Sequence, residues 1–401
     1  NYEWAFHVTN NNTMDDTVYA DWAKRNELLS RFYQSGLPIT QLPDIDGKPN
    51  PWWQRWMAHP DFDKYYQSMV PVGEEYRHIT IPVLTVTGYF DGGQISALDY
   101  LKRHKRFNPD ADHRLLIGPY SHGTAQGKVW ESFSNYTLDP VALDKDTEEV
   151  VFGWFDHLLF NKAVPKLVSH AVNYQLMGSN QWRHAESLAG LNSQGVQYYL
   201  GTTPLANGRY RLLTRQEQLP ASIEMTVDMA DRTTQRNVSP WPLIQDKIND
   251  ETGLVYVTEA FTSPMELAGA ITGNIVISTN KQDVDIGYNF YAISPKDEVF
   301  HLNTYRSRAS YAHSMQQRQL LTPGKKTSVP IVNARMTAKL LEPGSRLAIV
   351  LNVNKNQDAQ VNHGSGKPVN AESSADAGEP LTVKWHNDTQ IMLPLKPWRS
   401  Q

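Results

Sequence analysis

The stretch IPVLTVTGYFDGG (residues 81–93) decides the fold of this chain. Its first eight residues form a short apolar run rich in β-branched side chains, which is typical of a buried parallel strand. A second run of this kind, RLLIG (residues 114–118), follows a stretch of helical periodicity with a basic end at residues 95–106. Because a strand, a helix and a strand occur within this length, the sequence predicts a βαβ unit with two parallel strands.

Each predicted strand runs into a loop that carries a side chain suited to acid–base chemistry. Asp91 follows the first strand, and His122 follows the second, 122 − 91 = 31 positions later. Ligand chemistry in open α/β sheets lies at the carboxyl ends of the strands, and α/β-hydrolases carry their triad in the order serine, acid, histidine. The two loops therefore predict a catalytic pair, in which His122 exchanges a proton with a serine and Asp91 orients its ring.

The rest of the chain divides into a helical and a β-rich region. Before residue 79 the pattern is irregular and helical, most clearly at residues 16–33, and a further helix is expected at residues 147–160. After about residue 168, short alternating runs separated by Gly, Pro, Asn and Asp predict a β-sandwich or jelly roll. These runs are residues 196–200, 253–258, 273–278, 288–292 and 346–352. Residues 355–380, rich in Asn, Gly, Ser and Asp, are expected to form a long surface loop.

The composition excludes several classes of protein. The 401 residues carry 38 basic and 42 acidic side chains, and this net charge of −4 gives no electrostatic case for nucleic acid binding. No apolar run approaches the roughly 18 residues that span a bilayer, so no membrane anchor is expected. Cysteine is absent, which removes disulfides and thiolate chemistry, and the 13 histidines show no metal-ligand spacing. We therefore expect no metal and no cofactor, since triad chemistry needs neither.

At this point the chain resembles the X-prolyl dipeptidyl peptidase-like hydrolases, which include cocaine esterases, α-amino acid ester hydrolases and glutaryl cephalosporin acylases. The matching stretches are HPDFDKYYQSMVP, IPVLTVTGYFDGG, RLLIGPYSHG, GWFDHLLF, YQLMGSNQWR, VNHGSGKPV and LTVKWHND. The resemblance implies the C-terminal part of an α/β-hydrolase sheet with the remnant of a helical cap, followed by an all-β jelly roll. It implies a cap segment at residues 1–78, the sheet at 79–165 and the jelly roll at 166–401, with Asp91 as acid and His122 as base.

Two departures from the family pattern bear on function. The nucleophile elbow G-x-S-Y-x-G is absent, because Ser121 belongs to the histidine loop and Ser365 to a polar loop. We therefore expect the serine, and the N-terminal portion that carries it, to lie outside this chain. Where α-amino acid ester hydrolases place carboxylates after the catalytic aspartate, this chain has Gly93 and Gln94. This difference favours a neutral or acidic acyl group over an α-amino one.

The resulting hypothesis is a serine hydrolase of the esterase or acylase type that acts on a small-molecule ester or amide. Tyr89, Phe90 and Tyr120 flank the expected pair and are candidates for the substrate pocket, with packing of the strand ends as the alternative. A periplasmic or secreted bacterial location is expected from the lack of cysteine and from the family resemblance. A homo-oligomer is compatible with the sequence, which is silent on the oligomeric state.

Two other functions are compatible with the residues. One is a true X-prolyl dipeptidyl peptidase, which needs an anionic clamp for the substrate N-terminus. The other is a non-catalytic binding module, in which the acidic pair Asp283 and Asp285 could hold a cation or ligand and exposed tryptophans could bind sugar. The competing interpretation makes the acidic pair part of a turn before a strand. It makes the tryptophans Trp130, Trp182 and Trp241 packing residues.

Overall fold

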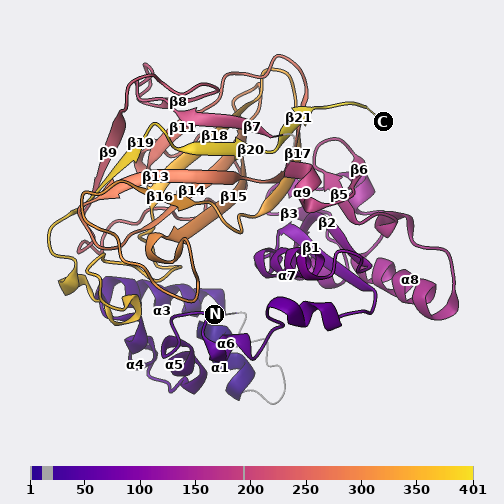
Figure 1. The fold of residues 1–401 in the computed structure, drawn as a ribbon, viewed down its shortest axis with the longest axis horizontal. Coiled ribbons are helices and arrows are strands. Elements are labelled where there is room, and N and C mark those ends of the chain that lie inside the picture. Colours follow the sequence, from indigo (N-terminus) through magenta and orange to yellow (C-terminus); the bar gives the residue numbers. More distant parts are fainter. Residues whose placement is uncertain (1, 11–20, 193–194, 401) are drawn as a thin grey trace.

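The computed structural model describes residues 2–10, 21–192 and 195–400. Figure 1 shows a group of N-terminal helices below a large β-rich part, with a smaller mixed part beside it that includes helices α7 (Gln94–Phe107) and α8 (Thr147–Phe160). Both helices were expected from the sequence, and the second has the predicted bounds. Within the described residues, none of the helices combines the length and apolar character that crossing a membrane requires.

The N-terminal helices form a small core of their own. Their elements are α1 (Tyr2–Asn10), α3 (Trp22–Ser35), α4 (Leu42–Asp46), α5 (Pro51–Met57) and α6 (Lys64–Gln67), with 3-10 turns η1 (Ile39–Gln41) and η2 (Gly73–His78). Tyr2, Leu28, Leu42 and Trp53 are the buried residues of this core. The helix predicted at residues 16–33 corresponds to α3, and residues 16–20 of that prediction lie outside the described residues.

A four-stranded sheet contains the two strands predicted first. Its order is β1 (Val83–Phe90), β2 (His113–Ser121), β5 (Val172–Leu176) and β6 (Gln181–Ala185). Strands β1 and β2 are parallel and α7 connects them, so the predicted βαβ unit is confirmed. Strand β5 is parallel to β2, whereas β6 is antiparallel to β5. Residues 172–185, which lie in the stretch that the sequence assigned to the jelly roll, extend this sheet, because β5 pairs with the buried residues Leu115–Ile117 of β2.

The β-rich part follows, as the sequence predicted. Its short helix is α9 (Leu188–Asn192), and its main sheet has the order β10-β15-β14-β18-β11-β8-β7-β20-β13-β19-β9, with β16 paired to β13. A three-stranded sheet has the order β17-β12-β21. The strands are β7 (Val196–Leu200), β8 (Tyr210–Leu213), β9 (Ser222–Val227), β10 (Ile244–Gln245), β11 (Leu254–Val257), β12 (Met265–Ala270), β13 (Thr272–Thr279), β14 (Asp285–Ile293), β15 (Val299–Arg308), β16 (Thr327–Pro330), β17 (Met336–Leu341), β18 (Arg346–Val353), β19 (Leu381–His386), β20 (Gln390–Leu393) and β21 (Leu395–Pro397).

The segment at residues 355–380 is a surface loop only in part, because buried and exposed residues alternate along it. Lys355 is 1 % exposed, and Glu372 and Ala377 are also buried. Its polar groups find partners inside the protein: Lys355 Nζ lies 2.8 Å from Asp231 Oδ2, and the Glu372 carboxylate accepts from the backbone N–H groups of His363 and Ser365. A polar composition indicates exposure only when the polar groups form their hydrogen bonds with water. Here Lys355 and Glu372 form them with other groups of the protein.

The acidic pair before β14 is also buried, and each carboxylate faces an arginine. Asp283 accepts hydrogen bonds from the backbone N–H and hydroxyl of Ser310 and lies 2.9 Å from Arg318 Nη2. Asp285 holds Arg308 by two bonds of 2.8 and 2.9 Å. Since each carboxylate already has a guanidinium partner, the pair forms a structural ion-pair network. Asp283 precedes β14, as the turn interpretation had it, whereas Asp285 is the first residue of that strand.

We expect the Asp283→Ala variant to lose about 3–5 kcal/mol of unfolding free energy, because it leaves Arg318 and the Ser310 donors buried without their acceptor. Chemical denaturation followed by tryptophan fluorescence measures this loss. Asp250→Ala is the matched control, since Asp250 pairs with Arg209 at the surface and such pairs contribute about 1 kcal/mol at most. Equal midpoints for the two variants would show that the Asp283 network does not stabilise the fold.

Candidate active site

Asp91 lies directly after β1 in a short turn that holds its carboxylate from two sides. The Thr87 hydroxyl donates to Oδ2 at 2.8 Å, and the Gly93 backbone N–H donates to Oδ1 at 2.7 Å. The side chain is 7 % exposed, so both bonds are shielded from water. The turn thus fixes a buried carboxylate with a defined orientation.

His122 follows β2 and meets this carboxylate. Its Nδ1 atom lies 2.8 Å from Asp91 Oδ1, whereas the imidazole as a whole is 72 % exposed. With Asp91 ionised, this contact requires the proton on Nδ1, which leaves the Nε2 lone pair on the exposed side of the ring. The structure therefore brings together the two residues that the sequence paired.

The environment of Asp91 keeps it ionised. Burial alone would raise the pKa of the Asp91 carboxyl, but the hydrogen bonds from Gly93, Thr87 and His122 together hold that pKa below its ordinary value. A carboxylate that remains charged can both orient an imidazole and stabilise its protonated form.

The parallel pairing of β1 and β2 explains why two loops 31 positions apart meet. The strands are in register from Val83 to Gly88, and the register then shifts before Phe90 pairs with Ser121. A Cβ at Gly88 would lie 1.9 Å from the Tyr120 backbone oxygen, so only glycine permits this close approach. Because of the register shift and the close approach at Gly88, the ends of both strands lie at the same edge of the sheet.

The β-rich part anchors the Asp91 turn through contacts that the sequence gave no sign of. The buried Gln94 side chain accepts from the Met336 backbone N–H at 2.7 Å and donates to its carbonyl at 3.1 Å. Arg335 Nη1 donates to the Asp91 backbone oxygen at 2.6 Å. These partners are more than 240 positions away from the turn, and no local pattern could have indicated them.

The exposed nitrogen of His122 has one neighbour on its own loop. Gln126, in the 3-10 turn η3 (Thr124–Gln126), places its side-chain nitrogen 3.1 Å from His122 Nε2 and 3.3 Å from the His122 backbone oxygen. An amide N–H can donate to the Nε2 lone pair. Gln126 therefore occupies the position from which a nucleophile's hydroxyl would donate to this base.

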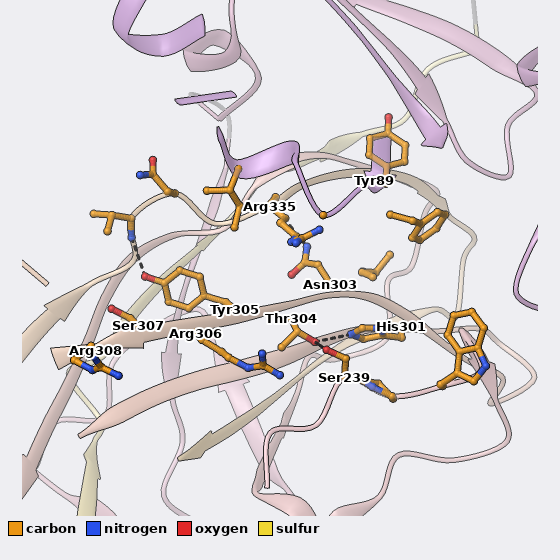
Figure 2. A pocket seen from close by; sticks show the side chains of 18 of the residues that line it. Tyr89, Ser239, His301, Asn303, Thr304, Tyr305, Arg306, Ser307, Arg308 and Arg335 are labelled. Carbon is orange, nitrogen blue, oxygen red and sulfur yellow. Dashed lines mark hydrogen bonds between the residues drawn. The ribbon is translucent and has the colours of Figure 1, made fainter. Parts of the chain in front are cut away.

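A cavity of about 770 Å³ opens beside the Asp91 turn, between the end of β1 and strand β15. Tyr89, Phe90 and Gly92 line it from the side of β1, and Tyr89 is labelled in Figure 2. The Tyr89 hydroxyl is turned away and donates to the Gln175 backbone oxygen at 2.6 Å, so that the body of the ring faces the cavity. This volume is within the range of small-molecule pockets.

Tyr120 differs from the other two pocket candidates, because it is buried in the hydrophobic core and is not among the residues lining the cavity. Its ring packs over Gly118 and near Trp182, and burial raises the pKa of its phenol. The packing alternative given for the three aromatic residues thus applies to Tyr120, since its side chain points into the sheet rather than to the strand end.

The three tryptophans considered as sugar platforms lie in different surroundings. Trp182 donates to the Val141 backbone oxygen and is half-buried, whereas Trp130 is 58 % and Trp241 66 % exposed. Trp241 lines the cavity and meets Phe133 edge-on at a centroid distance of 5.9 Å. Packing therefore accounts for Trp182 alone, because the other two have most of their surface in solvent.

No group of three or more His, Asp or Glu side chains is arranged to hold a metal ion in residues 2–10, 21–192 and 195–400.

Comparison with known proteins agrees with this arrangement of parts. The chain is 23 % identical over 325 residues to a cocaine esterase from a Rhodococcus species, which covers 78 % of this chain and 55 % of that protein. Its fold is similar to an aminopeptidase from a marine sediment Thaumarchaeota archaeon, with a TM-score of 0.75 at 17 % identity, over 91 % of this chain and 63 % of that one. It is also similar to an α-amino acid ester hydrolase, with a TM-score of 0.74 at 16 % identity, over 90 % of this chain and 64 % of that one. The chain thus spans between 55 % and 64 % of the length of these relatives.

The resemblance drawn from the sequence motifs is confirmed by these relatives, which are hydrolases with a C-terminal β domain. Residues 169–391, more than half of the chain, match the family described as the X-Pro dipeptidyl-peptidase C-terminal non-catalytic domain, and the chain belongs to that family.

Proposed function

We propose that this chain supplies the acid and the base of a serine hydrolase that cleaves ester or amide bonds, of the esterase or acylase type. The observation that carries the proposal is the 2.8 Å contact between His122 Nδ1 and the buried Asp91 carboxylate at adjoining strand ends. The hydrolase relatives support the same reaction class. On this proposal the helical segment is the remnant of a cap, the four-stranded sheet the end of an α/β-hydrolase sheet, and the β-rich part a jelly roll.

The proposed chemistry follows from the two nitrogen atoms of His122. Nδ1–H donates to Asp91, so Nε2 takes the proton from a serine hydroxyl as that oxygen attacks the substrate carbonyl. The imidazolium formed in this way is stabilised by the ionised Asp91, and Nε2 then returns the proton to the leaving alcohol or amine. The Gln126 amide turns aside when the serine hydroxyl takes its place at Nε2.

The nucleophile in this proposal comes from outside the 401 residues. The chain contains no G-x-S-Y-x-G turn, and Gln126 is the side chain within hydrogen-bonding distance of His122 Nε2 among the described residues. The partner of this chain is therefore the portion of the enzyme that carries the serine. The periplasmic or secreted location and the oligomeric state stay predictions from the sequence.

A fluorophosphonate probe, which reacts with activated serines, tests the proposal. We expect the 401-residue chain to stay unlabelled and the longer gene product to gain one label, located by peptide mass spectrometry on a serine outside these residues. Labelling of the 401-residue chain would place the nucleophile within it. A longer product that takes no label, and turns over no ester, would contradict the proposed reaction class.

The X-prolyl dipeptidyl peptidase alternative is less well supported by the cavity. Such an enzyme must hold the ammonium group of its substrate's N-terminus, and no aspartate or glutamate is among the described residues that line the cavity. Turnover of Pro-containing dipeptidyl anilides at rates above those of simple esters would favour that alternative.

A non-catalytic binding role for the β-rich part is a second candidate, favoured by the family that residues 169–391 match. Trp241, exposed at the cavity mouth, is the side chain that would serve it. Binding to a glycan array by a longer gene product that shows no esterase activity would support this role over catalysis.

A further inference from the structure

The cavity beside Asp91 has a charge pattern that the catalytic pair does not explain. Three arginines line it, Arg306 and Arg308 from β15 and Arg335 from the turn before β17, whereas its described lining contains no acidic residue. Arg308 is neutralised by its two bonds to Asp285. Among the described residues, neither Arg306 nor Arg335 has a salt-bridged carboxylate. Their charges are offset only at longer range, by Asp358 and Asp285 for Arg306 and by Asp91 for Arg335.

Both of these arginines are held in place by backbone oxygens. Arg306 Nη2 donates to the Asn237 backbone oxygen at 3.1 Å, and its Nε is buried without a hydrogen-bond partner. Arg335 Nη1 donates to the backbone oxygen of Asp91. The backbone thus fixes the position of each guanidinium group and leaves its charge for another partner.

The Asn303 amide also lines the cavity, and its oxygen can accept a hydrogen bond from a donor, not from an anion. Asn303 is 5 % exposed, and its Oδ1 atom is buried without a hydrogen bond. In the view of Figure 2, Asn303 lies between Arg335, on the side of Tyr89, and Arg306, on β15. Burial lowers the pKa of His301 to about 4, so that His301 is neutral at pH 7 and adds no third charge.

Burial is the main electrostatic influence on the two arginines. It lowers the pKa of Arg306 and of Arg335. Asp358 and Asp285 raise the pKa of Arg306, whereas Arg335 lowers it because the two cations repel each other. Asp91 raises the pKa of Arg335. An anion placed between two partly desolvated guanidinium groups would relieve both the desolvation and the repulsion.

The cavity also has an aromatic wall. Phe90 stacks on Phe133 at a centroid distance of 4.9 Å, and Trp241 meets Phe133 edge-on. Arg335, which bonds to the Asp91 backbone, lies beside Phe90 and Gly92, the neighbours of Asp91. The cavity therefore offers a ligand both an aromatic surface and guanidinium groups.

We propose that this cavity binds a carboxylate borne by the acyl part of the substrate, with Arg306 and Arg335 as its partners and the acyl chain against Phe90 and Phe133. A carboxylate fits because a guanidinium group binds two oxygen atoms in one plane. The role of this site in selecting a substrate rests on the proposed function, whereas the binding of a carboxylate in the cavity does not.

Binding is tested by calorimetric titration of the protein with adipate and with adipamide, which has the same shape without the charge. We expect adipate to bind at least tenfold more tightly, and Arg306→Gln to remove this preference. Arg306→Lys keeps the positive charge and should restore part of the preference for adipate. Circular dichroism of both variants checks that a lost preference is not caused by a loss of folding. Arg77→Gln, at an exposed arginine remote from the cavity, is the control and should bind as the unaltered protein does.

Turnover separates this inference from the proposed function. In the longer gene product, mono-p-nitrophenyl adipate should have a kcat/KM at least tenfold above that of the p-nitrophenyl ester of adipic acid monoamide, and Arg306→Gln should abolish the difference mainly through KM. Equal turnover of both esters, unaltered by Arg306→Gln, would overturn the anion site and leave the hydrolase standing. Selective binding of adipate without turnover of either ester would support the anion site and contradict the hydrolase.

Discussion

Replacement of His122 by alanine is expected to lower kcat of the serine-containing enzyme by a factor on the order of 10⁶, the largest effect of any single substitution in this chain. The imidazole is the one group in the described site whose lone pair faces the open side while its other nitrogen bonds to a buried carboxylate. Without it, the serine hydroxyl has no base, and the leaving group has no acid.

Steady-state hydrolysis of p-nitrophenyl acetate measures this loss, and an unchanged melting temperature shows that the fold survives, since the side chain is largely exposed. His157→Ala is the matched control, because His157 lies on α8 and contacts the Lys162 backbone oxygen rather than the site. Turnover within tenfold of the unaltered enzyme in the His122 variant would remove His122 from the mechanism.

The Asp91→Asn variant is expected to lose a factor of about 10⁴ in kcat at neutral pH while keeping its fold. An asparagine oxygen can still accept from Thr87 or Gly93, whereas its amide group would donate to His122 Nδ1 and stabilise the wrong tautomer. Nε2 would then carry the proton and could not serve as the base.

A kcat measurement across pH 5–8 tests this variant against Asp99→Asn, whose carboxylate pairs with Arg103 on the surface of α7. The pKa of Asp91 is below its ordinary value, so Asp91 is ionised throughout this range. Its contribution to stability is present above the ordinary carboxyl pKa near 4 and is lost as pH falls through the lower folded value. A loss of less than tenfold in Asp91→Asn would show that His122 does not depend on this carboxylate.

The sequence was sufficient for the features that rest on local patterns. The run at residues 81–88 and the loop residues Asp91 and His122 could be placed because parallel strands end at one edge of a sheet. Helix α8 was predicted because its apolar residues recur at helical spacing. In the structure an Asp146–Glu149 capping box begins it, and Asn161 ends it in the left-handed region.

Other features could not be predicted because composition does not reveal partners. The polar segment 355–380 is buried in part, since Lys355 bonds to the distant Asp231 and Glu372 accepts from His363 within the segment. The pairing of β5 and β6 with the sheet of β1 and β2 could not be predicted because a short buried strand has the same pattern in any sheet.

What the sequence by itself determined is the βαβ unit, the β-rich character after it, and the meeting of Asp91 with His122 at the strand ends. Only the tertiary structure decided what surrounds that pair. Arg335 and Met336 reach the Asp91 turn, and Arg306 enters the cavity, from strands more than 200 positions away. The physical reason is that strand pairing and helix periodicity are set by neighbours along the chain, whereas the charge of a cavity depends on which distant surfaces pack together.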